Sequence, residues 1–228
     1  MVRASLACLV VSFAPVVASA QELKVEVLKE AAPSAVAAPI RETLGEQGFR
    51  VIQGGKPLVD IWLRQAVPAS AKPSGAKGSL LYPVLTEGEV VGAARYHAEG
   101  QDYRDQVIAP GLYTMRYGLR LDDGNHANVS PYKDYFLLLP AAKDTTLPAV
   151  AAKALHKASA GASGTTHPAV LNLAIPPGPT ASATAPTLTH EEMDNIWGLV
   201  VPLGLAVAGE SAPQSVPLNL VIVGASAG

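Results

Sequence analysis

The chain has 228 residues, of which 49% are hydrophobic and 16% are charged, and its formal net charge at pH 7 is −2. This composition is typical of one globular domain, and it contains no basic cluster that would indicate binding to nucleic acid. The one cysteine, Cys8, lies in an apolar N-terminal segment. Disulfides, thiolate metal sites and cysteine nucleophiles are therefore excluded from the rest of the chain.

Residues 1–20 have the pattern of a secretory signal peptide. Arg3 precedes an apolar run over residues 4–17, and Ala18-Ser19-Ala20 matches a small-x-small cleavage site. Cleavage before Gln21 would leave a single domain, 21–228. No later apolar run reaches the ~20 residues of a membrane helix. We therefore expect a secreted or periplasmic protein with no membrane span after cleavage.

Alternating apolar and polar residues predict β-strands through the first half of the chain. The strand-like runs are residues 23–27, 49–64, 80–94, 111–121 and 135–140. Gly54-Gly55, at the centre of the second run, predicts a two-residue hairpin loop. In the fourth run Tyr113 and Tyr117 lie on one face and Thr114 and Arg116 on the other. This strand should be buried on the first face and wet on the second.

Residues 141–187 are rich in Ala, Ser, Thr, Pro and Gly, which predicts a flexible excursion. Within it, residues 147–159 can form a short alanine-rich helix with Pro148 in its first turn, and residues 171–175 can form a strand. Residues 189–192 could cap a brief helical turn. Alternation then resumes over 197–207, where Pro202 favours an edge position or a bulge. Residues 217–224 predict the last strand.

These runs predict an all-β fold: an antiparallel β-sandwich or jelly roll with one short Ala-rich helix in a long excursion. The strands are separated by Gly, Pro, Asn and Asp, as the turns of such folds require. The fold class alone assigns no activity.

The connection DDGNHANVSPYKD, residues 122–134, is the richest in polar groups. Turn chemistry explains residues 122–125 without any ligand. It does not explain His126, which could bind a divalent metal together with His167 and a carboxylate from Asp122, Asp123 or Asp134. The histidine spacing is not that of a specific metal motif.

All seven tyrosines fall between Tyr82 and Tyr135. Tyr113 and Tyr117 fit the buried face of a strand. Charged residues, glycine or proline flank Tyr96, Tyr103 and Tyr132, which makes these three the predicted exposed ligand-binding residues. The ligand class is open between a small molecule, a glycan and a protein.

Ser163, His167 and Asp134 are the residue types of a hydrolase triad, in which serine would be the nucleophile. Spacing alone does not bring the three together, and serine in an Ala-Gly-Ser-Thr stretch is usually a loop residue. The C-terminal GASAG, residues 224–228, matches a nucleophile elbow but lacks the helix that must follow it. No catalytic residue is assigned.

Residues 111–117 read Gly-Leu-Tyr-Thr-Met-Arg-Tyr, Asp123-Gly124 and His126 follow, and Lys133-Asp134-Tyr135 begin the next strand. This pattern, with residues 166–173, resembles a group of uncharacterised secreted bacterial all-β proteins. The resemblance implies an exported β fold and no known activity, so it transfers no catalytic residue.

The sequence therefore predicts an exported, non-enzymatic binding or structural module with an unknown ligand. The alternative function is a metal-binding protein or a metal-dependent hydrolase that uses His126 and His167 with a nearby carboxylate.

Overall fold

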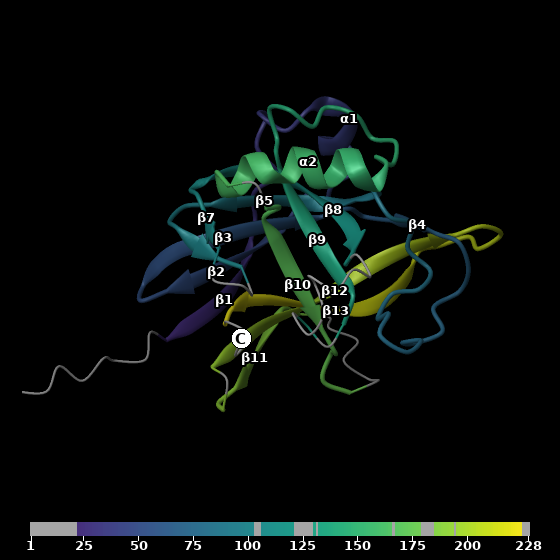
Figure 1. The fold of residues 1–228 in the computed structure, drawn as a ribbon. Helices are drawn as coiled ribbons and strands as arrows, with labels where there is room; N and C mark the ends of the chain where they lie inside the picture. Colours follow the sequence, from purple (N-terminus) through teal and green to yellow (C-terminus); the bar gives the residue numbers. More distant parts are fainter. Residues whose placement is uncertain are drawn as a thin grey trace, which may run out of the picture.

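The computed structural model describes residues 22–102, 106–120, 130, 132–165, 167–178, 185–193 and 195–224. Strands dominate, which confirms the all-β prediction (Figure 1). The strands are β1 (Leu23–Leu28), β2 (Gly48–Gln53), β3 (Lys56–Leu63), β4 (Val67–Ala69), β5 (Val90–Tyr96), β6 (Gly100–Gln101), β7 (Val107–Ile108), β8 (Gly111–Leu119), β9 (Asp134–Pro140), β10 (Val170–Ala174), β11 (Thr187–Glu191), β12 (Ile196–Val207) and β13 (Gln214–Val223). The helices are α1 (Ala38–Arg41) and α2 (Ala152–Ser163).

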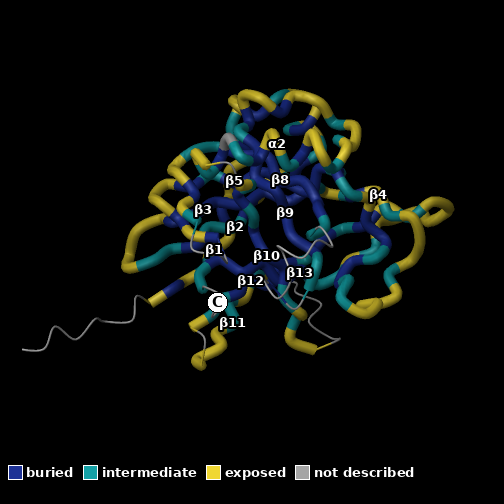
Figure 2. The backbone as a smooth tube through the Cα atoms, viewed as in Figure 1, coloured by how far each residue is buried: buried dark blue, intermediate teal, exposed yellow. Residues whose placement is uncertain are grey.

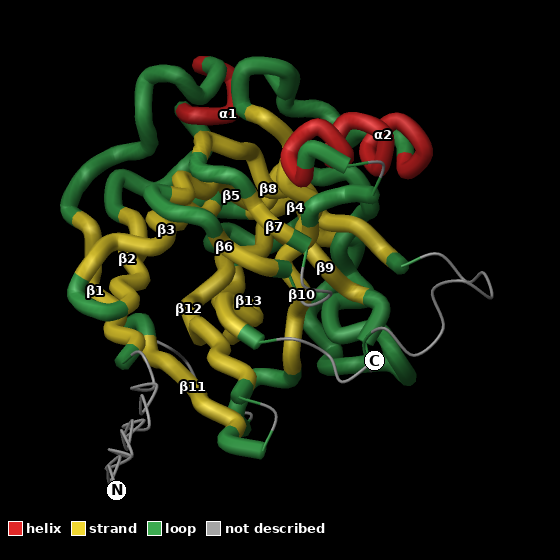
Figure 3. The backbone as a smooth tube through the Cα atoms, turned by 60° about the vertical axis from the view of Figure 1, so that its left-hand side comes forward, coloured by secondary structure: helices red, strands yellow, loops and turns green. Residues whose placement is uncertain are grey.

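The strands other than β6 and β7 form one continuous sheet in the order β1-β2-β3-β5-β8-β9-β10-β13-β12-β11. Neighbours along this path are antiparallel, and β4 adds a parallel pairing to β12. The sheet curls until its two end strands, β1 and β11, contact each other (Figure 3). The two facing sheets of a sandwich or jelly roll are therefore not confirmed, because all described strands except the short pair β6–β7 belong to one curled sheet.

The main hydrophobic core fills the inside of this curl (Figure 2). Alternate residues of each strand point inward, such as Val59 and Ile61 from β3 and Leu218 and Leu220 from β13. A tight turn joins β2 to β3. Gly54 and Gly55 form it with φ of 56° and 78°, as a two-residue hairpin loop requires. This hairpin prediction is confirmed.

The outer face of the first half of the sheet is also covered. Val36, just before α1, and Ile40, within α1, pack with Trp62 of β3. Leu155 of α2 packs on Leu137 of β9 and its neighbours. Strands β3, β5, β8 and β9 are consequently buried on both faces. Neither described helix has the length and hydrophobicity needed to cross a bilayer.

The prediction that Thr114 and Arg116 face water is wrong, because both side chains are fully buried. Arg116 donates from Nε and Nη2 to the two carboxylate oxygens of Asp144, at 2.7 and 2.8 Å. Its remaining N–H groups reach the main-chain oxygens of Gly88, Pro148 and Thr146. The Thr114 hydroxyl donates to Asp144 at 2.5 Å. The segment after β9 thus turns back over the face of β8 that was predicted to be wet, and together with the Gly88 carbonyl it satisfies all five guanidinium donors.

The alanine-rich helix is confirmed as α2, although it begins at Ala152 rather than near Pro148. It ends where Gly164 adopts a left-handed conformation with φ of 67°. The predicted strand within the excursion is confirmed as β10. The helical turn expected at residues 189–192 is wrong, since Thr187–Glu191 form strand β11.

Pro202 lies in β12, opposite Pro217 of β13. On its other side, β12 pairs with β11 through residues 196–200 and with β4 through residues 205–207. Pro202 lies in the gap between these two partners. No neighbouring strand on that side therefore needs a hydrogen bond from the N–H that proline lacks. β12 is not an edge strand, because it lies between β13 and β11 in the sheet, so the predicted edge position holds only locally, at the gap beside Pro202.

Candidate ligand-binding site

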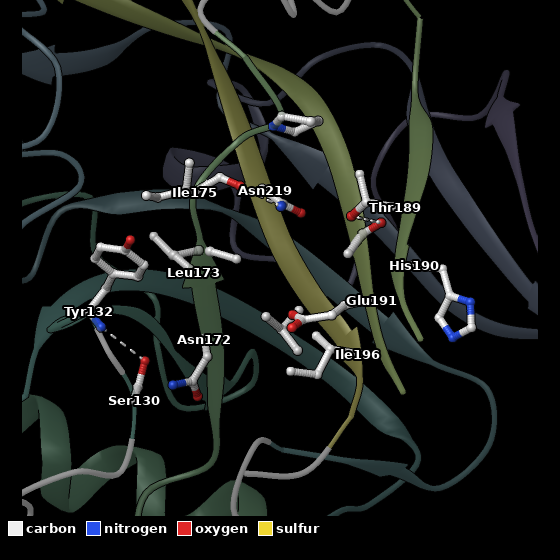
Figure 4. A pocket seen from close by; sticks show the side chains of 14 residues that line it. Ser130, Tyr132, Asn172, Leu173, Ile175, Thr189, His190, Glu191, Ile196 and Asn219 are labelled. Carbon is white, nitrogen blue, oxygen red and sulfur yellow. Dashed lines mark hydrogen bonds between the residues drawn. The ribbon is translucent and has the colours of Figure 1, made fainter. Parts of the chain in front are cut away.

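A pocket of about 350 Å³ lies on the outer face of β10, β13, β12 and β11, in the half of the sheet that the helices do not cover (Figure 4). Ser130 and Tyr132, just before β9, close one side of it. Its polar lining residues are Ser130, Tyr132, Asn172, Thr189, His190, Glu191 and Asn219. The pocket is large enough for a small molecule.

Asn172 and Asn219 form the floor of the pocket. Their strand neighbours Leu171, Leu173, Leu218 and Leu220 point into the core, so the pleat sends both asparagines to the outer face. Asn172 is only 6% exposed and Asn219 only 5%. The Nδ2 of Asn219 donates to the Ile175 carbonyl at 3.0 Å, whereas the Oδ1 atoms of both asparagines have no hydrogen-bond partner among the described residues.

A buried carbonyl oxygen without a donor costs about 1–3 kcal/mol. Two such oxygens on neighbouring strands of one pocket are unusual for a purely structural surface. They are the natural partners of a bound molecule that brings its own N–H or O–H groups.

Gly198 makes room for the Asn219 amide. A Cβ at position 198 would come within 2.2 Å of Asn219 Oδ1 and 2.5 Å of Thr189 Oγ1. The β12–β13 register shifts at Trp197/Gly198, which marks a bulge at the same place. The absence of a side chain at residue 198 therefore lets the Asn219 amide and the Thr189 hydroxyl approach each other across β12.

Strand β11 contributes the rim. Glu191 pairs with Ile196 in the strand register, and its side chain reaches from β11 across the pocket (Figure 4). The neighbouring His190 points away in the same view. Its ring stacks on Trp197 with centroids 4.0 Å apart, and its Nε2 is 3.0 Å from Asn195 Oδ1. Glu191 is therefore the rim residue that faces a ligand.

The opposite wall comes from Ser130 and Tyr132, which belong to the polar connection 122–134. The Arg120 guanidinium donates to the Ser130 carbonyl at 2.8 Å, and the Tyr132 N–H donates to the Ser130 hydroxyl at 3.3 Å. The structure thus places Tyr132, one of the three predicted ligand-binding tyrosines, at a pocket.

The prediction that Tyr96 is exposed is wrong, because this residue is only 2% accessible. The alternation of β5 directs it inward together with Ala94, where it meets the edge of Tyr113 with centroids 6.3 Å apart. Its charged sequence neighbours did not decide its direction. Tyr103 lies outside the described residues.

Asp134, a predicted metal ligand, is fully buried at the start of β9. Its carboxylate accepts hydrogen bonds from the N–H groups of Leu81 and Tyr82, at 2.8 and 3.0 Å, and from the Tyr117 hydroxyl at 2.6 Å. Burial and the bond to Asp134 raise the pKa of Tyr117 above its ordinary value, so the phenol remains a donor. These contacts make Asp134 a structural acceptor.

The structure does not bring His167 and Asp134 together. The β9–β10 register pairs Val170 with Leu137 and Asn172 with Tyr135, which puts His167 and Asp134 at opposite ends of the pair. Their separation along the strands is about 20 Å. No group of three His, Cys, Asp or Glu suited to a metal occurs in the described part of the chain. Asp122, Asp123 and His126 lie outside that part, so a metal at these residues stays a prediction.

The considered triad of Ser163, His167 and Asp134 does not form. The Ser163 hydroxyl donates to the main-chain oxygen of His167 at 2.6 Å, and this contact belongs to the turn that follows α2. Asp134 is at the far end of β9, as described above. Ser163 is thus part of a turn and not of a charge-relay arrangement.

The residues that sequence reasoning missed carry a visible signal. Asn172 and Asn219 each occur in a Leu-Asn-Leu triplet, at residues 171–173 and 218–220. Each triplet places one amide in an otherwise apolar strand. Only the pairing of Leu173 with Leu220, which joins β10 to β13, shows that the two amides share one surface.

A separate charged cluster was also missed, on the outer face of β2, β3 and β5. Asp60 is fully buried and accepts two hydrogen bonds from Arg50, at 2.6 and 2.8 Å. His97 Nε2 lies 2.7 Å from its second oxygen. Burial alone would raise the pKa of Asp60, but the bonds from Arg50 and His97 outweigh it and hold that pKa below 3.8.

Asp60→Asn is expected to lower the free energy of unfolding by about 1–3 kcal/mol at pH 5, because it removes the carboxylate that the arginine fork and His97 share. A depressed pKa gives stability that is complete above the unfolded value of about 3.9 and is lost as the pH falls through the folded value. The difference between Asp60→Asn and the natural protein should therefore shrink from pH 5 to pH 2. Urea unfolding at both pH values measures it, and a constant difference would refute this account.

No protein-family model, curated protein or solved structure matches the chain. Its function has to be inferred from its own geometry.

Proposed function

We propose that the protein is an exported, non-enzymatic binding module whose ligand site is the pocket over Asn172 and Asn219. The supporting observation is the pair of buried Oδ1 atoms at the floor of a pocket of about 350 Å³, for which the described residues supply no donor. A ligand with N–H or O–H groups would supply the missing donors. The signal-like pattern of residues 1–20 supports export.

The hydroxyl groups of the pocket support binding rather than catalysis. Ser130 Oγ accepts from the Tyr132 N–H, and Thr189 Oγ1 donates to the Gly198 carbonyl at 3.4 Å. A serine or threonine nucleophile instead needs a hydrogen bond to a general base. The lining groups position and hold a ligand without an activated attacking atom.

Filling the pocket tests the proposal. Ala174 lines the pocket and is half-buried, so Ala174→Phe places a ring in the space of the ligand. Ala212→Phe is the matched control, because Ala212 is exposed and is not part of the lining. We expect ligand-observed NMR with a library of small polar compounds to find binders that Ala174→Phe loses and Ala212→Phe keeps.

The same binders should shift the amide resonances of Asn172, Asn219 and Thr189 in the natural protein. Thermal melting of both variants checks that they are folded. Binders that Ala174→Phe leaves unaffected, or a library without any binder, would contradict the proposed site.

A further inference from the structure

The charge of the pocket restricts its ligand. Among the described lining residues Glu191 is the only carboxylate, and none is lysine or arginine. The Glu191 side chain extends over the pocket, while His190 is held outside by Trp197 and Asn195 (Figure 4). An anionic ligand would face a like charge and no cation among the described lining residues, and the nearby Arg120 guanidinium is engaged with the Ser130 carbonyl at 2.8 Å, so the electrostatics favour a positively charged molecule.

The hydrogen-bonding capacity points the same way. The Oδ1 atoms of Asn172 and Asn219 and the Glu191 carboxylate are all acceptors, and the Asn219 Nδ2 donor already binds the Ile175 carbonyl. A ligand that satisfies these three acceptor groups must therefore bring several donors. Ammonium and guanidinium groups have only donors.

The remaining walls suit the rest of such a molecule. Leu173, Ile196 and Val221 give the pocket an apolar part that fits a short alkyl chain. The Tyr132 ring forms the wall opposite β11 (Figure 4). An aromatic face attracts cations as well as alkyl groups.

We propose that the ligand of this pocket is a small organic cation, with one or two primary ammonium or guanidinium groups on a short aliphatic chain. Glu191 pairs with the charge, and the amides of Asn172 and Asn219 accept from its N–H groups. This inference rests on the proposed binding function and names the class of its ligand.

The test uses three probes of similar length: 1,4-diaminobutane, 1,4-butanediol and succinate. Each is titrated into the whole domain, residues 21–228, at pH 7 and low salt, with calorimetry and amide chemical shifts as readouts. We expect the diamine to bind most tightly and succinate not to bind. Salt should weaken diamine binding, since a charge pair near the surface is screened.

Glu191→Gln should weaken diamine binding by at least about tenfold, the loss expected for one charge-assisted hydrogen bond. Glu192→Gln is the matched control, because Glu192 is the exposed neighbouring carboxylate and does not line the pocket. It should bind the diamine as the natural protein does. Glu191 is itself exposed, so neither variant threatens folding.

The outcomes separate this inference from the proposed function. If the diol binds as well as the diamine, or if Glu191→Gln leaves diamine binding unchanged, the cation inference is overturned while the pocket remains a binding site. Preferential binding of succinate also overturns it. If none of the three probes binds and the library used with Ala174→Phe gives no binder, both proposals fail.

Discussion

Replacing Arg116 with methionine is expected to lower the free energy of unfolding by about 3–5 kcal/mol, the cost of leaving a buried partner charge uncompensated. Methionine keeps much of the volume but removes all five donors. Asp144, only 4% exposed, would keep the Thr114 hydroxyl as its one remaining side-chain donor. Urea unfolding monitored by circular dichroism measures the change.

The double variant Arg116→Met/Asp144→Leu is the control for this ion pair. Removal of both charges should cost less than the sum of the two single replacements, because neither charge is left alone in the core. A loss below about 1 kcal/mol for Arg116→Met would show that the network contributes little to stability.

Asp134→Ala is expected to cost about 3 kcal/mol or more, because two buried main-chain N–H groups lose their acceptor and the Tyr117 hydroxyl keeps only its longer contact to the Tyr82 carbonyl, at 3.3 Å. The two N–H groups, of Leu81 and Tyr82, have no other acceptor in the described hydrogen bonds. Tyr117→Phe removes one donor and leaves the other two satisfied, so it should cost only about 1 kcal/mol.

The ratio of these two effects is the diagnostic quantity. Chemical denaturation of both variants gives it, and hydrogen exchange at the Leu81 and Tyr82 amides should accelerate in Asp134→Ala far more than in Tyr117→Phe. Equal destabilisation by the two replacements would mean that Asp134 acts mainly through the tyrosine.

Local pattern was sufficient where a feature depends on neighbours in the sequence. The Gly54-Gly55 hairpin and the strand β10 follow from short stretches, and the structure confirms them. Chain order was not sufficient to predict strand order, because β13 lies between β10 and β12. The alternation of apolar and polar residues within a strand does not indicate which distant strand pairs with it.

The direction of a side chain was mispredicted where a distant segment covers it. Arg116 alternates with apolar residues as a solvated arginine would, and only the return of residues 144–148 over β8 makes it a core residue. Tyr96 was assigned by its charged neighbours although its strand phase decides its direction. The pocket was missed for a related reason, since two Leu-Asn-Leu triplets 47 positions apart meet only in the folded sheet.

The guanidinium of Arg116 holds the return segment, residues 144–148, through the carbonyl groups of Thr146 and Pro148 and through one side chain, that of Asp144. A carbonyl is the same group in every residue type. The Arg116 network therefore tolerates other side chains at Thr145, Thr146 and Pro148, provided that the backbone keeps its course, whereas Leu147 also packs against the cluster around Trp62. The identity requirement is concentrated instead in one arginine and one aspartate, which are 28 positions apart.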